Sequence, residues 1–407
     1  MKIKIFKGNA SGSVVAPPSK SYAHRLLIAS FLSNKKCIVS NVELSNDIMA
    51  TVNCIKELGG SFIIQDNEVI FDGKNDKEIK DEYVLECGES GSTIRFLIPI
   101  ALVLKKGSRI TMKGTKKLIS RGLSVYEDIF KYSNIDYSYT EDSFSFCGKL
   151  TKSKFTVPGN ISSQYISGLI FALSLLKRDT TITITGNIES LPYINLTIDT
   201  LAHFNVTIEL KENIVYIMGH QKYARSNSNV EGDFSNAAFL EALNYVDLNN
   251  NVNVKGLNYF SRQGDSVYMK LFPKLEGTTP VIDISNCIDL GPILFTVSSM
   301  LNGAKITGIK RLRIKESDRV ACMVEELSKF GAEIEVYEDE VIIKKKELHE
   351  PDSILNGHND HRIVMSLAVL TTKFGGVIDG IEAVNKSFPT FFSKLGEVGI
   401  KYENYEG

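Results

Sequence analysis

A seven-residue stretch, Arg313 to Arg319, concentrates more potential chemistry than any other segment of the chain. Its sequence, RIKESDR, contains three cations and two carboxylates. Apolar residues recur after it at helical spacing, so we expect a helix that begins near Ser317 and ends at Gly331. Glu316 and Arg319 would then lie beside the helix N-terminus. Taken alone, the pattern is also typical of a capped surface helix with a solvated charge cluster.

Other cations also stand where apolar helical patterns begin. A helix N-terminus carries about half a positive elementary charge, so cations there are unfavourable unless an anion binds beside them. Arg95 could instead be a buried ion-pair partner, and Arg121 an ordinary loop charge. Asp289, Asp360 and the segment Ser162 to Gln164 could simply cap their helices. The number of cations at equivalent positions nevertheless favours a multiply charged anionic ligand: they are Lys20, Arg25, Arg95, Lys315, Arg319 and Arg362.

Reactions between anions also need proton transfer, and two carboxylates are well placed for it. Asp289 and Glu316 both lie beside cations. The sequence contains no metal-ligand spacing, Walker loop, Ser/His/Asp series or nucleophilic cysteine motif. The residues therefore predict a two-domain enzyme for small phosphorylated acids that closes like a clamp.

The composition agrees with a globular protein of two domains. The chain has 407 residues, is 43% hydrophobic, and has 47 Lys plus Arg against 48 Asp plus Glu, so any basic patch must be local. The six cysteines are scattered, which suggests a reducing cytoplasm. The longest apolar run, Phe96 to Leu104, is about half the length of a membrane span. We expect a soluble cytoplasmic protein.

Polar or Gly-containing clusters run directly into long apolar helices at six places. The residues that mark them are separated by 71, 72, 72, 55 and 70 residues; the markers are Lys20, Gly91, Ser163, Ser235, Leu290 and Asp360. Near-constant intervals of this kind indicate repeated supersecondary units. Because these first helices are almost wholly apolar, each should be buried on all sides.

A second helix and short strands follow each first helix. In the fourth repeat, for example, a helix over 266–275 leads into a strand over 281–284. The pattern predicts a βαβαββ unit six times, three per domain, with a cleft between the domains. One domain would comprise residues 1–14 and 229–407, and the other residues 15–228, with the crossings in polar sequence.

Nine motifs, in order over nearly the whole chain, resemble the 5-enolpyruvylshikimate-3-phosphate synthase family. They are PPSKSYAHR (17–25), CGESGSTIRF (87–96), SRGL (120–123), ISSQY (161–165), LPYI (191–194), EGDFS (231–235), RIKESDR (313–319), NDHR (359–362) and NKSFPTF (385–391). The resemblance implies an inside-out α/β barrel pair. It also implies transfer of the enolpyruvyl group of phosphoenolpyruvate to the 5-hydroxyl of shikimate 3-phosphate, in the pathway to chorismate and aromatic amino acids. No metal or organic cofactor, nucleic acid or membrane would be involved, and the protein would be a monomer.

The resemblance also implies roles for individual residues. Asp289 would accept a proton, Glu316 would exchange one at C3 of phosphoenolpyruvate, and Lys20 would contact both substrates. The shikimate 3-phosphate would be held by Lys20, Ser21, Arg25, Ser162, Ser163, Gln164, Ser190, Asp289 and Lys315. The phosphoenolpyruvate would be held by Lys20, Gly91, Arg121, Gln164, Arg319, Arg362 and Lys386. Arginine suits the carboxylate and phosphate of that substrate.

Four positions depart from the commonest pattern of the family: Glu89, Phe96, Leu191 and Arg311. Gly91 leaves room beside the phosphoenolpyruvate site, so we expect sensitivity to glyphosate, which mimics that substrate. Two rivals remain. One is UDP-N-acetylglucosamine enolpyruvyl transferase, although Ser21 stands where that family has Asn. The other is a catalytically silent anion- or nucleic-acid-binding module, which the near-zero net charge disfavours.

Overall fold

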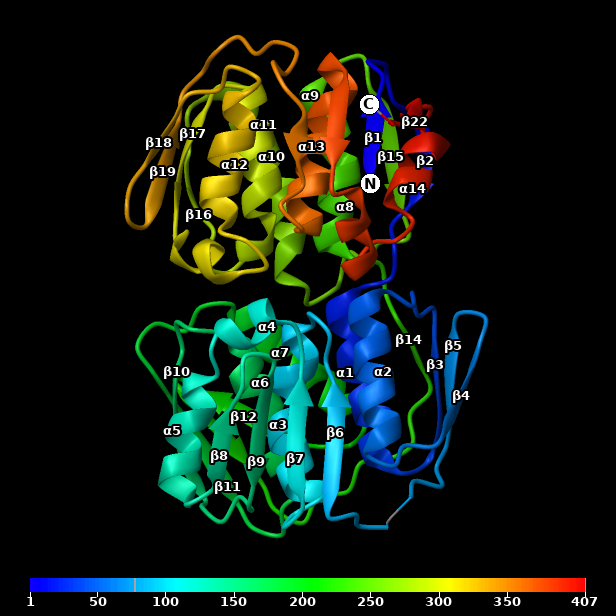
Figure 1. The fold of residues 1–407 in the computed structure, drawn as a ribbon, viewed down its shortest axis with the longest axis vertical. Helices are drawn as coiled ribbons and strands as arrows, with labels where there is room; N and C mark the ends of the chain where they lie inside the picture. The colour runs from blue at the N-terminus through cyan, green and yellow to red at the C-terminus, as the bar shows by residue number, and fades with distance from the viewer. Residues whose placement is uncertain (77, 407) are drawn as a thin grey trace. The chain divides into compact units, whose positions relative to one another are not determined.

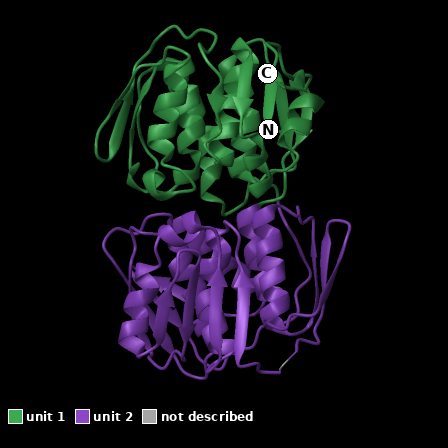
Figure 2. Cartoon of the chain, in the orientation of Figure 1, with its two compact units in different colours: residues 1–19, 232–407 green, residues 20–231 purple. Residues whose placement is uncertain are grey.

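The chain forms two compact units in the computed structural model, which describes residues 1–76 and 78–406. Unit 1 consists of Met1–Ser19 and Gly232–Gly407, and unit 2 consists of Lys20–Glu231 (Figure 2). The chain therefore crosses into unit 2 after Ser19 and returns after Glu231. The sequence placed these boundaries a few residues earlier, after residues 14 and 228.

The two crossing segments pair with each other, which explains the later boundaries. The backbone N–H of Asp233 donates to the carbonyl oxygen of Pro17 over 2.8 Å, and Pro18 forms an antiparallel bridge with Gly232. Nε2 of the buried Gln263 also donates to the carbonyl oxygen of Gly232 over 2.8 Å. These contacts keep both prolines in unit 1.

Unit 2 contains three repeats of the predicted kind (Figure 1). Its sheets have the orders β6-β7-β9-β8, β10-β11-β13-β12 and β14-β3-β5-β4, and in each the first two strands are parallel and the others antiparallel. The strands are β3 (Lys36–Ser40), β4 (Phe62–Gln65), β5 (Glu68–Asp72), β6 (Glu82–Glu86), β7 (Arg109–Lys113), β8 (Asp136–Tyr139), β9 (Ser143–Cys147), β10 (Lys154–Pro158), β11 (Thr180–Thr185), β12 (Ile208–Lys211), β13 (Ile214–Ile217) and β14 (Ser228–Asn229). The first helices are α1 (Lys20–Ser33), α3 (Gly91–Leu104) and α6 (Ser163–Leu173). The others are α2 (Asn46–Glu57), α4 (Lys116–Ser120), α5 (Ser124–Ser133) and α7 (Leu191–His203).

Unit 1 is built in the same way, with sheet orders β16-β17-β19-β18, β20-β21-β1-β22 and β15-β2. The N-terminal strand β1 lies between β21 and β22, so it belongs with the C-terminal half as predicted. The strands are β1 (Lys2–Ile5), β2 (Ser11–Val15), β15 (Asn251–Lys255), β16 (Val281–Asp283), β17 (Ala304–Thr307), β18 (Ile334–Val336), β19 (Glu340–Ile343), β20 (Leu355–Asn356), β21 (Gly376–Asp379) and β22 (Tyr402–Asn404). The helices are α8 (Phe234–Glu241), α9 (Leu243–Val246), α10 (Tyr268–Gly277), α11 (Gly291–Met300), α12 (Arg319–Ser328), α13 (His361–Phe374) and α14 (Phe391–Glu397).

The fourth repeat is shorter than predicted. The strand expected to close it, β16, pairs in parallel with β17 and therefore opens the next sheet. Within the described residues, the sheet of the fourth repeat contains only β15 and β2. The missing hairpin accounts for the interval of 55 residues between Ser235 and Leu290, where the other intervals are 70 to 72.

The first helix of each repeat was expected to be buried on all sides and the second to expose a polar face, and α3 and α12 show this difference. Every residue of α3 from Thr93 to Leu102 is buried, whereas α12 exposes one face. Each unit has its own apolar core. The helix expected to begin near Ser317 begins at Arg319. The side chain of Asp318 caps it by accepting hydrogen bonds from the backbone N–H groups of Val320 and Ala321.

No helix in the described part of the chain is long and apolar enough to cross a membrane. The longest, such as α3 and α13, have 14 residues, whereas a span requires about 20. All six cysteines are free thiols.

Candidate active site

Arg319 is the centre of a buried ion-pair network in unit 1. Its side chain is 1% exposed at the first residue of α12. All three nitrogens of the guanidinium donate: Nε to Oδ2 of Asp360 over 2.8 Å, Nη1 to Oδ1 of Asp289 over 3.0 Å, and Nη2 to Oε2 of Glu316 over 2.8 Å. The stretch that begins at Arg313 is therefore not a solvated charge cluster, which was the simpler interpretation of its sequence.

The charges of this network stabilise one another. Burial by itself would lower the pKa of Arg319, but the neighbouring carboxylates, that of Asp360 above all, raise it well above its ordinary value. Burial would likewise raise the pKa of Asp360, yet the charge of Arg319 lowers it below the ordinary value of an aspartate. Both groups are therefore charged throughout the physiological pH range.

Asp289 lies where three cations meet. It belongs to a single helical turn, Ile288–Leu290, just before α11. Besides its contact with Arg319, Oδ1 is 3.3 Å from Nζ of Lys315 and Oδ2 is 3.3 Å from Nη2 of Arg362. The Asp289 side chain is 21% exposed, so a ligand can reach it. Such a carboxylate can accept a proton from a bound hydroxyl while the surrounding cations hold anionic groups.

Lys315 faces Asp289 and has a lowered pKa. Burial lowers the pKa of Lys315 from 10.5 to about 8. The positive charges of Arg319 and Arg311 act in the same direction, while the negative charges of Asp289 and Glu316 oppose them. Lys315 is therefore mostly protonated at neutral pH and loses its proton in mild alkali. Arg311, one of the four unusual positions, thus has an electrostatic effect on this site.

The segment before α13 brings two further predicted cations to the same region. The carboxylate of Asp360 caps α13, because its Oδ1 accepts from the backbone N–H of Arg362 over 2.9 Å. Nη1 of Arg362 donates to the carbonyl oxygen of Asp289 over 3.1 Å. Nζ of Lys386, which is 8% exposed, donates to the carbonyl oxygen of Asn359. Asp360 therefore caps its helix, as considered from the sequence, and also pairs with Arg319.

In unit 2, Lys20 opens α1 and forms an ion pair that the sequence did not predict. Its Nζ is 2.7 Å from Oδ2 of Asp47, and both side chains are mostly buried, with 17% and 14% exposed. Asp47 lies in the first turn of α2. An acidic residue there is a usual helix-stabilising feature, so its type alone gave no signal that it would pair with a site lysine.

Arg25 is anchored by neutral groups one turn further along α1. Its Nε donates to Oγ1 of Thr197 over 2.8 Å, and its other nitrogens donate to the carbonyl oxygens of Ser21, over 2.7 Å, and Tyr193, over 3.0 Å. The guanidinium also lies 5.1 Å from the ring centroid of Phe96, another unusual position. Burial lowers the pKa of Arg25 to about 10. Among the described residues these partners of Arg25 are all neutral, and a buried arginine held in this way is suited to bind an anion.

Ser162, Ser163 and Gln164 open α6 as predicted. Oγ of Ser162 caps the helix by accepting from the N–H of Gln164 over 3.3 Å. Oε1 of Gln164 accepts from Nη1 of Arg95 over 2.8 Å, and its Nε2 donates to Oγ of Ser92 over 2.9 Å. Arg95 is therefore held by an amide rather than by the buried ion pair considered from the sequence, and it fixes the orientation of a predicted substrate-binding residue.

Gly91 lies against two guanidinium groups at the start of α3. A Cβ at this position would come within 3.0 Å of Nη1 of Arg95 and 3.3 Å of Nη1 of Arg121. A larger residue would displace one or both of them. Ser190, the remaining predicted residue of unit 2, is buried and adopts a left-handed conformation, with φ 57°, immediately before α7.

Each unit thus gathers a different set of functional groups. Unit 1 brings together carboxylates and cations, which suits proton transfer beside an anion. Unit 2 gathers cations with hydroxyl and amide groups, which suits a ligand with phosphate and hydroxyl groups. The groups missed from the sequence are partners of the predicted ones: Asp47, Thr197, Tyr193 and Ser92.

Comparison with known proteins identifies a family for this arrangement. Residues 6–395 match the family model described as EPSP synthase (3-phosphoshikimate 1-carboxyvinyltransferase). A 3-phosphoshikimate 1-carboxyvinyltransferase of Clostridium acetobutylicum is 40% identical, with 98% of this chain and 97% of the relative covered. One from Clostridium perfringens is 38% identical, with 98% of each covered.

A solved structure gives the same result for the fold. An EPSP synthase from Acinetobacter baumannii superposes with a TM-score of 0.79, and the match covers 99% of this chain and 100% of that one. The identity is only 22%, so this likeness concerns the fold. It confirms the predicted two-domain α/β architecture, with the shortened fourth repeat as the one departure described above.

Proposed function

The chain belongs to the EPSP synthase (3-phosphoshikimate 1-carboxyvinyltransferase) family, and from this premise we propose how its residues share the reaction. The enzyme transfers the enolpyruvyl group of phosphoenolpyruvate to the 5-hydroxyl of shikimate 3-phosphate and releases phosphate. This is a step of the shikimate pathway, which leads to chorismate and the aromatic amino acids.

Shikimate 3-phosphate is the ligand that we assign first to the groups of unit 2. The hydroxyls that open α6 can donate to a phosphate without adding charge, and the positive end of that helix dipole favours the anion. Arg25 offers a preorganised guanidinium, because Thr197 and two carbonyl oxygens already fix its plane. The full proposed set is Lys20, Ser21, Arg25, Ser162, Ser163, Gln164 and Ser190, with Asp289 and Lys315 at the reacting hydroxyl.

Phosphoenolpyruvate carries a carboxylate and a phosphate, and we assign it to the arginines. Bidentate arginine contacts match both groups in geometry and charge. Arg121 and Arg95 border Gly91 closely, so the small residue would let the ligand approach the backbone at the start of α3. The proposed set is Lys20, Gly91, Arg121, Gln164, Arg319, Arg362 and Lys386.

The proton transfers fall to the two carboxylates of unit 1. Glu316 delivers a proton to C3 of phosphoenolpyruvate, which makes C2 electrophilic. The 5-hydroxyl oxygen then attacks C2 while Asp289 takes the hydroxyl proton, giving a tetrahedral intermediate. Loss of one proton from C3, back to Glu316, and of phosphate from C2 forms the enol ether. Lys20 and Lys315 offset the negative charge that accumulates on the oxygens.

The observation that carries this proposal is the partly exposed Asp289 carboxylate with Lys315, Arg319 and Arg362 around it. Phosphate release from phosphoenolpyruvate should be measured in three mixtures: with shikimate 3-phosphate, with UDP-N-acetylglucosamine, and with neither. We expect release only with shikimate 3-phosphate. Release only with the UDP-sugar would assign the chain to the rival transferase, and no release in any mixture would support a silent binding module.

The lowered pKa of Lys315 predicts how the activity depends on pH. Since the pKa is about 8 in the folded protein, the cation is present below pH 8 and lost above it. We expect kcat/KM, which reports the free enzyme, to fall as pH rises through about 8, by up to tenfold per pH unit. In the variant Lys315→Arg the charge persists, so the fall should move to higher pH even if the activity is lower. An unchanged alkaline limb in this variant would assign it to another group.

The monomeric state and the cytoplasmic location, both expected from the sequence, stay predictions. Gel filtration with light scattering would test the first, and localisation of the native protein by cell fractionation would test the second.

A further inference from the structure

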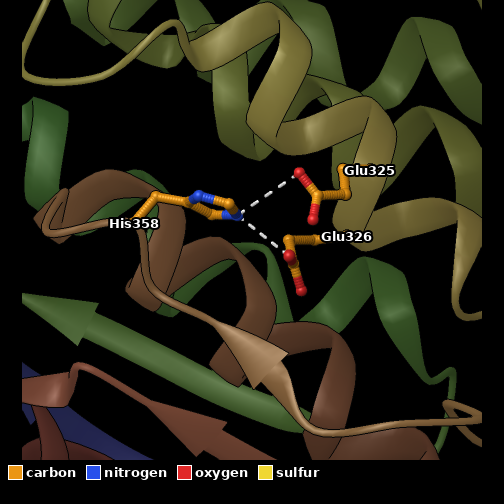
Figure 3. A group of neighbouring side chains, drawn as sticks. All are labelled: Glu325, Glu326 and His358. Carbon is orange, nitrogen blue, oxygen red and sulfur yellow. Dashed lines mark hydrogen bonds and ion pairs between the residues drawn. The ribbon is translucent and has the colours of Figure 1, made fainter.

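A cluster of potential metal ligands lies in unit 1 at the opposite end of α12 from Arg319. It combines Glu325 and Glu326 of this helix with His358, which precedes α13 (Figure 3). Nε2 of His358 is 2.9 Å from Oε1 of Glu326 and 4.0 Å from Oε2 of Glu325. The three ligand atoms lie within 4.8 Å of one another. The three side chains therefore already point toward a common position.

Hydrogen bonds hold the carboxylate of Glu326 in one orientation. Its side chain is fully buried, and Nζ of Lys329 donates to both oxygens, over 2.9 and 3.0 Å. The backbone N–H of Asn356 also donates to Oε2, over 2.9 Å. These donors can remain in place while Oε1 binds an ion, and outer hydrogen bonds of this kind orient the ligands of many metal sites.

Cys322 lies on the same face of α12, one turn before Glu326. Its thiol faces His358, but the ligand atoms that lie within 4.8 Å of one another belong to Glu325, Glu326 and His358. The set that the geometry supports therefore consists of one imidazole nitrogen and two carboxylate oxygens, with Lys329 behind Glu326.

We propose that Glu325, Glu326 and His358 bind a divalent transition-metal ion of the zinc class. One imidazole nitrogen and two carboxylate oxygens suit tetrahedral zinc with water as the fourth ligand, whereas magnesium and calcium prefer six or more oxygens. Bonds of about 2.0 to 2.3 Å in a tetrahedron place ligand atoms roughly 3.3 to 3.7 Å apart. Nε2 must therefore move slightly away from Glu326, and the exposed carboxylate of Glu325 must move slightly inward.

The bound ion would stabilise an unfavourable loop. His358 and Asn359 both adopt left-handed conformations, with φ 48° and 52°, which side chains other than glycine seldom adopt. A metal bond to His358 would fix this loop to α12, immediately before the residues that cap α13. We therefore expect a structural role: binding should raise the thermal stability of the protein without taking part in the reaction.

The experiment uses the full chain after removal of metal with a chelator. Equilibrium dialysis at pH 8 should show one zinc ion per chain, a rise in Tm with zinc, and no comparable effect of magnesium. His358→Asn, chosen because asparagine tolerates the left-handed backbone, and the exposed Glu325→Gln should each weaken zinc binding at least tenfold.

A histidine elsewhere in unit 1 provides a matched control, because His349 is exposed and lies outside the cluster. The variant His349→Asn should bind zinc as the wild type does. The proposal is overturned if the wild type binds no zinc at one equivalent, or if His358→Asn binds it as tightly as the wild type. Those results would assign His358 to an ion pair alone.

Discussion

The variant Asp289→Asn should lose most of its turnover while it still binds both substrates. Asparagine has the shape of aspartate and can still accept hydrogen bonds from Arg319 and Lys315, which contact the native carboxylate. It cannot take the proton of the 5-hydroxyl. Loss of a general base costs roughly 10²- to 10⁴-fold in rate, so we expect kcat to fall within this range. Phosphate-release kinetics would measure the fall, and calorimetry would measure the binding of each substrate.

A control and a second carboxylate variant make this experiment decisive. Glu347→Gln changes an exposed carboxylate of unit 1 and should leave kcat unchanged. Glu316→Gln should also lower kcat, and it should slow exchange of the C3 hydrogens of phosphoenolpyruvate with solvent more than Asp289→Asn does. Near-normal turnover in Asp289→Asn would show that the base lies elsewhere, and Lys315, with its pKa of about 8, would be tested next.

Most of the repeat could be predicted from the sequence because each first helix is apolar around its whole circumference. A helix of that kind has only one stable environment, the interior, and α3 is accordingly buried along nearly all its length. The strands over 136–139 and 180–185 also lie where they were predicted. The physical signal in each case is local, since it depends only on neighbouring residue types.

The fourth repeat shows what such local signals leave out. The strand over 281–283 has β-branched residues and follows a helix, so its sequence fits the end of one repeat as well as the start of the next. Its backbone hydrogen bonds to β17 decide between them. Strand pairing depends on residues that are distant in the chain, and a single sequence contains no direct record of them.

The same distinction applies to the site. The cations were identifiable because a positive charge beside a helix N-terminus is unfavourable without an anionic partner, and the carboxylates were identifiable because they lie beside those cations in the sequence. The residues that pair with these groups could not be identified from the sequence. Asp360 looks like a helix cap and is one, yet it also binds Arg319 from 41 positions away. Asp47 likewise pairs with Lys20 across 27 positions. Asp360 and Asp47 each lie in the first turn of a helix or cap it, and each also pairs with a cation. The sequence pattern indicates only the first of these roles.

The second large effect should follow from Arg319→Met. Arg319 is 1% exposed and contacts three carboxylates, one of which, on Asp360, is fully buried. Removing the cation leaves those charges uncompensated, which costs about 3 to 5 kcal/mol at a buried ion pair. We expect the unfolding free energy of unit 1 to fall by that amount. Because the chain has no tryptophan, urea unfolding is best followed by far-UV circular dichroism.

Arg313→Met provides the matched control, because Arg313 belongs to the same stretch but is 33% exposed and 3.6 Å from its partner Asp318. An exposed pair contributes only about 0 to 1 kcal/mol. The double variant Arg319→Met/Asp360→Asn should regain part of the lost stability, since it removes a buried charge. The effect should also shrink in acid: the pKa of Asp360 is lowered in the folded protein, so its contribution is present above its unfolded pKa and is lost as pH falls through the folded one. Equal stability of the Arg313 and Arg319 variants would show that the network holds the site in place without stabilising the fold.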